Sequence, residues 1–98
     1  MSYFAVCTFD LKNATYDDYQ NAYRDLAEIG LYHALTSAQG SKVALPTTTC
    51  GGEFNGSSVG AVRDDLTEKV RRAFTAMGFK SEIFVAVGGE WAWGHRTT

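Results

Sequence analysis

A chain of 98 residues has room for one domain, and its 45% hydrophobic and 20% charged residues are the balance of a globular protein with a single core. The net charge of −2 argues against a broad basic surface of the kind that holds nucleic acid through many phosphate contacts. The scattered cysteines argue against a zinc site, and no run is long enough for a membrane helix or patterned as a secretory signal. We therefore expect one cytoplasmic domain over residues 1–98, with reduced thiols and no membrane contact.

The first strand is predicted over residues 3–9, where β-branched and aromatic side chains dominate. This run is apolar on both faces, which is typical of a strand that is covered on both sides. Helix one is predicted over residues 15–29, because Thr15 is a good N-cap and apolar residues then recur at helical spacing. Gly30 stands where a left-handed residue would end that helix.

The middle of the chain predicts a hairpin followed by a loop. Residues 31–37 form the second predicted strand, and the turn at 39–41 contains the glycine that tight hairpins need. The third strand is predicted over residues 42–50, with regular pairing only before Pro46, since proline cannot donate to a strand ladder. A glycine-rich loop is expected to follow over residues 51–56.

The last part of the chain completes a symmetrical order of elements. Helix two is predicted to begin at Ser57 or Ser58 and to end at Gly78. Residues 83–87 form the fourth strand, again apolar on both faces, and residues 90–93 alternate as a short added strand would. The order βαββαβ predicts a ferredoxin-like α+β fold: a four-stranded antiparallel sheet with two helices on one face and a short extra C-terminal strand.

Two helices on one side of such a sheet leave its other side uncovered. Exposing several large apolar side chains there costs about 1.5–3 kcal/mol each, so we expect a second copy of the chain to cover them in a dimer or a cyclic trimer. The alternative is that the two tryptophans fold back onto their own subunit. The expected interface residues are Phe4, Val6, Phe84, Trp91 and Trp93.

Asp10, at the end of the first strand, is the main candidate for chemistry. Symmetry in an oligomer would bring two such carboxylates together, where they could hold Mg²⁺ and support a nuclease. Asp10 would then be both a metal ligand and a catalytic residue. The alternative is that Asp10 caps the turn before helix one, as aspartates after strands often do.

The loop before helix two is the candidate site for an anion or a small molecule. Free N–H groups and the helix dipole favour negative charge at a helix N-terminus. The alternative is a plain connecting loop, since the phosphate-binding string G-x-x-x-x-G-K-[ST] is absent. The candidate ligand-binding residues are Gly51, Gly52, Glu53, Asn55, Gly56, Ser57 and Ser58.

Other reactive side chains give weaker signals. His33 lies in a predicted strand as a surface residue or a hydrogen-bonded core residue, and no serine or cysteine can be paired with it from the sequence. Cys7 is predicted to be buried in a strand and therefore inert.

Several short motifs resemble the CRISPR-associated adaptation subunits of the Cas-two type and their SinR-like relatives. The segment FAVCTFDL, residues 4–11, is similar to their hydrophobic strand that ends in aspartate. Residues 16–33 are similar to the helix with a "DY…L" pattern, the glycine and the strand that follow it. The segments EIFVAV, residues 82–87, and GEWAW, residues 89–93, resemble their final strand and its tail.

This resemblance implies a homodimer, favoured over a trimer, in which Asp10 is the family's metal-linked aspartate, Mg²⁺ is the cofactor and nucleic acid is cut by an endonuclease. Two alternatives stay open. One is a PII-like oligomer that binds or degrades a nucleotide or S-adenosylmethionine, which the glycine-rich loop favours. The other is a non-enzymatic interaction module, such as a toxin–antitoxin partner, which the tryptophan tail suggests. The sequence leaves open whether the protein is an enzyme.

Overall fold

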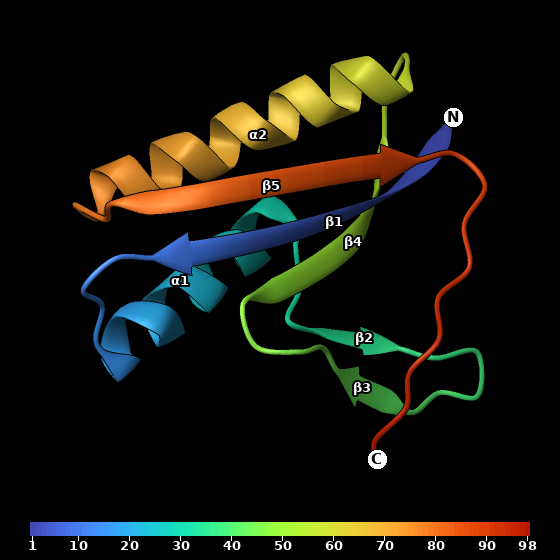
Figure 1. Cartoon of the computed structure of the whole chain (residues 1–98). Helices are drawn as coiled ribbons and strands as arrows, with labels where there is room; N and C mark the ends of the chain where they lie inside the picture. Colours follow the sequence, from blue (N-terminus) through green and yellow to red (C-terminus); the bar gives the residue numbers. More distant parts are fainter.

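The computed structural model describes residues 1–98, and its sheet is built around a long central strand. Neither helix is both long enough and apolar enough to cross a bilayer. The architecture is mixed α+β, as expected. Along the chain (Figure 1), the elements are β1 (Ser2–Leu11), α1 (Tyr16–Ile29), β2 (Ala34–Thr36), β3 (Lys42–Ala44), β4 (Thr49–Asn55), α2 (Val59–Ala76) and β5 (Ser81–Gly88).

The main sheet has three antiparallel strands in the order β4-β1-β5. β1 pairs with β4 over residues 2–8 and with β5 over residues 4–11. β2 and β3 pair with each other as a separate two-stranded hairpin beside the main sheet (Figure 1). The prediction of a four-stranded sheet is therefore wrong, because the segment after α1 joins β4 only through a single bridge between Tyr32 and Gly51.

Pairing between the segment after α1 and β4 stops at this bridge because the backbone N–H and C=O of Thr49 are already bound. A continued antiparallel ladder would join Ala34 to Thr49. Instead, the Thr49 carbonyl oxygen lies 3.0 Å from Nδ1 of the His33 ring, and the Thr49 N–H donates to the Pro46 carbonyl at 3.1 Å. The chain consequently leaves the main sheet and forms the hairpin of β2 and β3.

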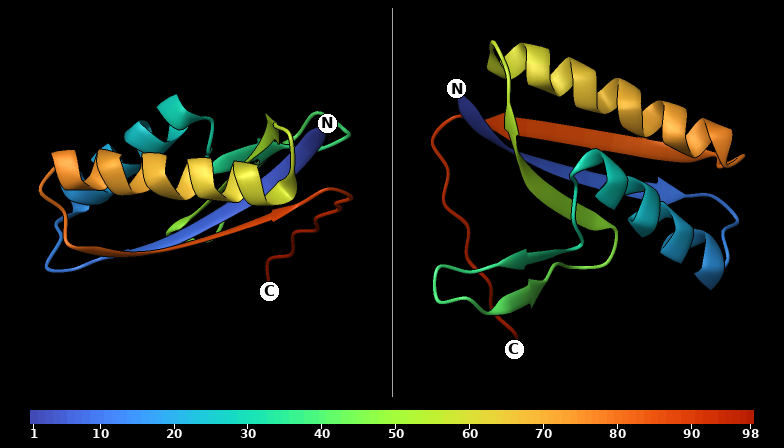
Figure 2. Two further views of the ribbon diagram at one scale, coloured as in Figure 1. Left: turned by 90° about the horizontal axis from the view of Figure 1, so that it is seen from above. Right: turned by 180° about the vertical axis from the view of Figure 1, so that it is seen from behind.

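Both helices cover the same face of the sheet, here called the inner face (Figure 2). Alternate residues of β1 point to this face and are all buried: Tyr3, Ala5, Cys7, Phe9 and Leu11. Phe74 of α2 packs between Phe9 and Phe79, with ring centroids 5.3 and 5.7 Å away. Each large side chain buried in this way contributes about 1.5–3 kcal/mol. The helices complete the core with Ala22, Leu26, Val62, Leu66, Val70 and Phe74.

The helix ends confirm the predicted caps. Thr15 and Asp18 form a reciprocal capping box at the start of α1, with N···O distances of 3.0 and 3.2 Å. Gly30 follows α1 with φ 105°, a left-handed conformation that glycine adopts without steric cost. At the start of α2, the Ser58 hydroxyl accepts the N–H of Ala61 at 3.0 Å.

The segment after β5 forms no strand, contrary to the prediction for residues 90–93. A strand needs a free edge to pair with, and this segment leads off the end of the sheet and runs past the hairpin of β2 and β3 (Figure 1). Trp91 instead stacks on Phe4, with ring centroids 5.9 Å apart and an interplanar angle of 24°. Aromatic packing therefore holds the tail against the face of the sheet that the helices leave uncovered.

Candidate functional site

The uncovered face of the sheet, here called the open face, carries the first candidate site. The pairing of β1 with β5 sets Thr8 opposite Phe84 and Asp10 opposite Glu82, and these residues alternate with the buried ones of the inner face. Phe84 is 64% exposed, which is high for a large aromatic side chain. The open face thus combines an apolar centre with an acidic end.

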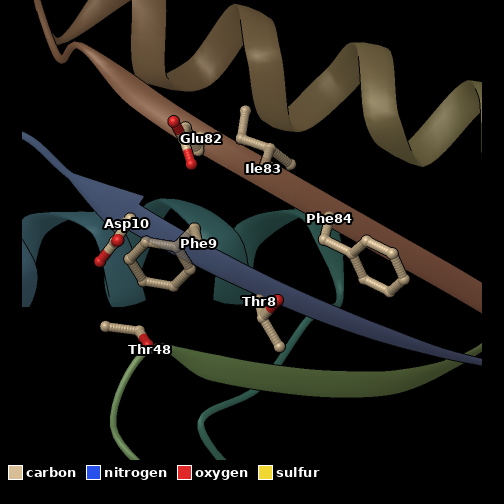
Figure 3. A pocket seen from close by; sticks show the side chains of 7 residues that line it. All are labelled: Thr8, Phe9, Asp10, Thr48, Glu82, Ile83 and Phe84. Carbon is tan, nitrogen blue, oxygen red and sulfur yellow. The ribbon is translucent and has the colours of Figure 1, made fainter.

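A hollow of about 500 Å³ lies at the acidic end and is here called the carboxylate hollow (Figure 3). Figure 3 shows Asp10 and Glu82 on neighbouring strands, with Thr48 contributed by the segment before β4. Strand pairing is the reason that the two carboxylates lie near each other, although they are far apart in the sequence. The hollow is lined by Thr8, Phe9, Asp10, Thr48, Glu82, Ile83 and Phe84.

Both carboxylates are available to a ligand. Asp10 is exposed and takes no part in the cap of α1, which Thr15 and Asp18 form. Glu82 lies 3.8 Å from the Lys12 ammonium, and both side chains are mostly exposed. An exposed ion pair of this kind is worth at most about 1 kcal/mol, so it does not prevent Glu82 from binding another cation.

The donor set fits Mg²⁺ but is small within one subunit. Proteins commonly hold Mg²⁺ through one or two carboxylates, with waters and phosphate oxygens as the other ligands. Asp10 and Glu82 supply such a pair. No group of three or more histidine, cysteine, aspartate or glutamate side chains comes together anywhere in the chain. A complete protein cage would need carboxylates from a second subunit.

The predicted glycine-rich loop is wrong for residues 51–55, which belong to β4. Gly51 and Gly52 are buried and lie opposite Val6 and Ala5 of β1. A Cβ atom at Gly52 would run into the carbonyl oxygen of Gly30 at the end of α1. Close approach of two backbone segments therefore explains this glycine, and no ligand is needed to account for it.

Of the other predicted ligand residues, Asn55, Gly56 and Ser57 line one hollow, whereas Glu53 and Ser58 lie outside it. Glu53 is exposed opposite Phe4, whereas Gly56, Ser57 and Ser58 connect β4 to α2. A hollow of about 230 Å³ at this connection includes Asn55 and Asp65 in its lining. The carboxylate of Asp65 is paired with the Lys69 ammonium at 2.9 Å, and no unpartnered polar side chain in this hollow points to a ligand.

The predicted interface residues lie on the open face of the sheet and on the tail that follows β5. Phe4, Val6 and Phe84 are on the open face, and Trp91 covers part of it by stacking on Phe4. Trp91 and Trp93 keep 37% and 38% of their surface exposed. Within one subunit, Trp91 therefore does fold back as the alternative expected, but Phe84 has no comparable cover.

A second hollow, of about 530 Å³, lies between α1 and the segment before β4 and was not predicted from the sequence. We call it the tyrosine hollow. The available signal was the repeat of tyrosines along helix one: Tyr19 and Tyr23 fit its apolar stripe and do pack against the core, but they also line this hollow. The hollow is lined by Tyr16, Tyr19, Gln20, Tyr23, His33, Thr47 and Thr48.

Two side chains of the tyrosine hollow have free polar atoms with defined roles. The rings of Tyr23 and His33 stack with centroids 4.1 Å apart and an interplanar angle of 15°. Nδ1 of His33 faces the Thr49 carbonyl, which can only accept, so Nδ1 carries the proton and Nε2 of the neutral ring is a free acceptor. The Tyr23 hydroxyl accepts the Thr48 N–H at 3.2 Å and keeps its own proton for another partner.

Thr48 is held in a strained conformation between the two hollows. Its φ of 64° lies in the left-handed region, which costs a β-branched residue about 1–3 kcal/mol. The Thr48 N–H donates to Tyr23, and the Thr48 carbonyl accepts the Phe9 N–H at 3.1 Å. These contacts hold the strain in place, and Thr48 lines both the carboxylate hollow and the tyrosine hollow.

The two cysteines are buried structural thiols. Strand pairing sets Cys7 opposite Cys50, and both are free and fully buried. Burial raises the pKa of Cys7 to about 11. Burial, with a further contribution from Cys7, raises the pKa of Cys50 to about 12. The prediction that Cys7 is buried is confirmed, and neither thiol is suited to act as a nucleophile at neutral pH.

Comparison with protein-family models, curated proteins and solved structures gave no match. The resemblance to the Cas-two-type subunits therefore stays a prediction that rests on the motifs themselves.

Proposed function

We propose that the protein works as a homodimer joined through the open face, in which Asp10 and Glu82 hold Mg²⁺ for hydrolysis of a nucleic-acid phosphodiester. One observation carries the proposal: the exposed Phe84 and the opposed Asp10–Glu82 pair share a single uncovered face. A second copy that covers the apolar centre would also reach the acidic end. Mg²⁺ bound there would supply a Lewis acid for the scissile phosphate.

The size of the open face supports such an interface. A stable protein–protein interface buries about 800 Å² on each partner. The molecule measures 36 × 35 × 20 Å, and the thin direction runs across the sheet and helix layers (Figure 2). The open face of the three-stranded sheet is one part of this broad side, next to the hairpin of β2 and β3 and the tail (Figure 1). Covering Phe84 alone would contribute about 1.5–3 kcal/mol.

The charges at the acidic end support a role for a cation. Asp10 and Glu82 of two facing subunits would repel each other unless a positive charge lay between them. Two lysines also lie at this end: the Lys12 N–H donates to the Lys80 carbonyl at 2.8 Å, and the Lys12 ammonium lies 3.8 Å from Glu82. These two charges offset those of Asp10 and Glu82, so Mg²⁺ would have to supply the net attraction for a phosphate backbone.

The proposal is tested by measuring self-association and cleavage together. Sedimentation of the protein with and without Mg²⁺ should show a dimer that Mg²⁺ strengthens. Single-stranded RNA and duplex DNA should be cut with Mg²⁺ and not with EDTA. Asp10→Asn should abolish cleavage and the effect of Mg²⁺ on dimerisation. The matched control is Asp17→Asn, which changes an exposed aspartate of α1 outside both hollows.

Two results would contradict the proposal. A monomer at all concentrations and Mg²⁺ levels would remove the interface. Cleavage that persists in carefully repurified Asp10→Asn protein would remove Asp10 from the chemistry.

A non-enzymatic interaction module is the second candidate, favoured by the exposed Phe84 and the partly exposed tryptophans. It needs an apolar surface but no carboxylates. Association that Phe84→Ala abolishes and Asp10→Asn leaves unchanged, without cleavage, would favour this function. The PII-like alternative has lost the feature that favoured it, since residues 51–55 are part of a strand.

A further inference from the structure

We infer that the tyrosine hollow is a binding site for a nucleobase, either in a free nucleotide or in a single-stranded nucleic acid. The inference does not depend on the proposed metal site. It rests on the aromatic lining, the two free polar atoms and the absence of charge in the hollow.

The aromatic lining suits a flat ligand. Tyr16, Tyr19 and Tyr23 come from one face of α1, and Tyr16 is 76% exposed at its first position. Tyr19 and Tyr23 already stack on Phe9 and His33, so the exposed ring of Tyr16 is the main surface on which the face of a nucleobase can stack. The volume of about 530 Å³ is in the range of small-molecule pockets, so one base with its sugar fits.

The two free polar atoms match the edge of a base. Nε2 of His33 is an acceptor, because the Thr49 carbonyl holds the proton on Nδ1. The Tyr23 hydroxyl has a proton to donate, because its oxygen already accepts the Thr48 N–H. Nucleobases present donors and acceptors side by side along one edge, so an acceptor and a donor from two stacked rings are complementary to them.

The charge pattern places the phosphate outside the hollow. No aspartate, glutamate, lysine or arginine lines the hollow, so it holds no fixed ion pair or charge cluster for a phosphate. Thr48 lines this hollow and the carboxylate hollow, so the two sites share a wall.

The strain at Thr48 supports a binding role. A β-branched residue with φ 64° is unfavourable, and this conformation is kept by the hydrogen bond from the Thr48 N–H to Tyr23. That same hydrogen bond orients the Tyr23 hydroxyl in the hollow. The strained residue thus positions a group that would contact the ligand.

The test is titration calorimetry without Mg²⁺, using AMP, GMP, CMP, UMP and a short single-stranded oligonucleotide, with ribose 5-phosphate as the ligand without a base. We expect binding of at least one base-containing ligand and none of ribose 5-phosphate. Tyr16→Ala should weaken binding about tenfold by removing one stacking partner. His33→Phe should weaken it similarly while keeping the ring. Tyr32→Ala is the control, since Tyr32 is also an exposed tyrosine but lines neither hollow.

The outcomes separate the ligand sources and the two proposals. Binding of mononucleotides assigns a free nucleotide, and binding of the oligonucleotide alone assigns a base within a strand; either supports the inference if Tyr16→Ala and His33→Phe weaken it. No binding of any base, or binding that both variants leave unchanged, overturns it. Asp10→Asn should bind the base normally without Mg²⁺, so lost cleavage with intact base binding would count against neither this inference nor the fold of the variant.

Discussion

The two faces of β1 come from alternate residues of one strand, yet they have different surroundings. On the inner face, Tyr3, Cys7 and Phe9 are at most 5% exposed and pack under both helices. On the open face, Asp10 and its neighbour Phe84 are exposed, and only the tail residue Trp91 packs nearby, on Phe4. Burial on the inner face is therefore what holds the fold together.

The surroundings of the two faces determine which residues are free to serve function. A residue of the inner face cannot change without disturbing the core, whereas the open face can carry an acidic end and an exposed phenylalanine at little cost to the fold. The tyrosine hollow lies at the side of the inner layer, where α1 meets the segment before β4. Residues of this hollow therefore pack against the core on one side and are accessible to solvent on the other.

The largest expected difference between the faces is between two phenylalanines. Phe74→Ala should lower the free energy of unfolding by about 3–5 kcal/mol, because it leaves a cavity between Phe9 and Phe79. Phe84→Ala should change the stability of the monomer by less than about 0.5 kcal/mol, because the ring is exposed. Urea unfolding at low protein concentration measures both. Equal losses would show that the open face is packed against something that the single chain does not reveal.

The next effect concerns the glycines of β4. Gly52→Ala should lower the free energy of unfolding by about 1–3 kcal/mol, because the added methyl group meets the carbonyl oxygen of Gly30. Gly60→Ala is the control: its Cβ would have room beside Arg63, and alanine should stabilise α2 by up to about 1 kcal/mol. Thermal or urea unfolding without ligands gives both values. If Gly52→Ala were as stable as the natural protein, close backbone approach would not explain this glycine, and a ligand-binding role would be the better explanation.

A smaller effect is the pH dependence of stability that the two buried thiols cause. The pKa values of Cys7 and Cys50, about 11 and about 12, lie above the ordinary value of 9.0, so both thiols stay protonated in the folded state when the unfolded chain has begun to ionise. Their contribution to stability is full below pH 9 and is lost as the pH rises toward 11 for Cys7 and toward 12 for Cys50. Urea midpoints between pH 8 and pH 11 should fall, and the double variant Cys7→Ala, Cys50→Ala should show a flatter decline. An equal decline in the double variant would assign the effect to other groups.

Much of the inner face could be predicted from the sequence, because its signals are local. Thr15, Gly30 and Ser58 mark helix ends through contacts with residues a few positions away. The alternation along β1 and the apolar stripes of both helices likewise depend only on the period of each element. Asp10 was placed correctly at the end of a strand for the same reason.

The features that were missed depend on contacts between distant parts of the chain. Glycines usually weaken a strand, so Gly51 and Gly52 indicated a loop. The structure requires glycine at position 52 because the backbone of Gly30 comes close to it, and that contact depends on the fold. The segment after α1 stops pairing with β4 because His33 binds the Thr49 carbonyl, and no local pattern predicts this contact. The partnership of Asp10 with Glu82 follows from strand register in the same way.

The smallest expected effect tests the strained residue that both hollows share. Thr48→Gly should raise the free energy of unfolding by about 0.5–1 kcal/mol, because glycine adopts φ 64° freely and relief of strain exceeds its entropic cost. Thr47→Gly should lower it, since Thr47 has no positive φ to relieve. Urea unfolding of both variants gives the signs. If Thr48→Gly is more stable yet binds nucleobases less tightly, the threonine side chain is kept for the ligand; if it is less stable than the natural protein, the strain is fully offset by packing, and Thr48 needs no functional explanation.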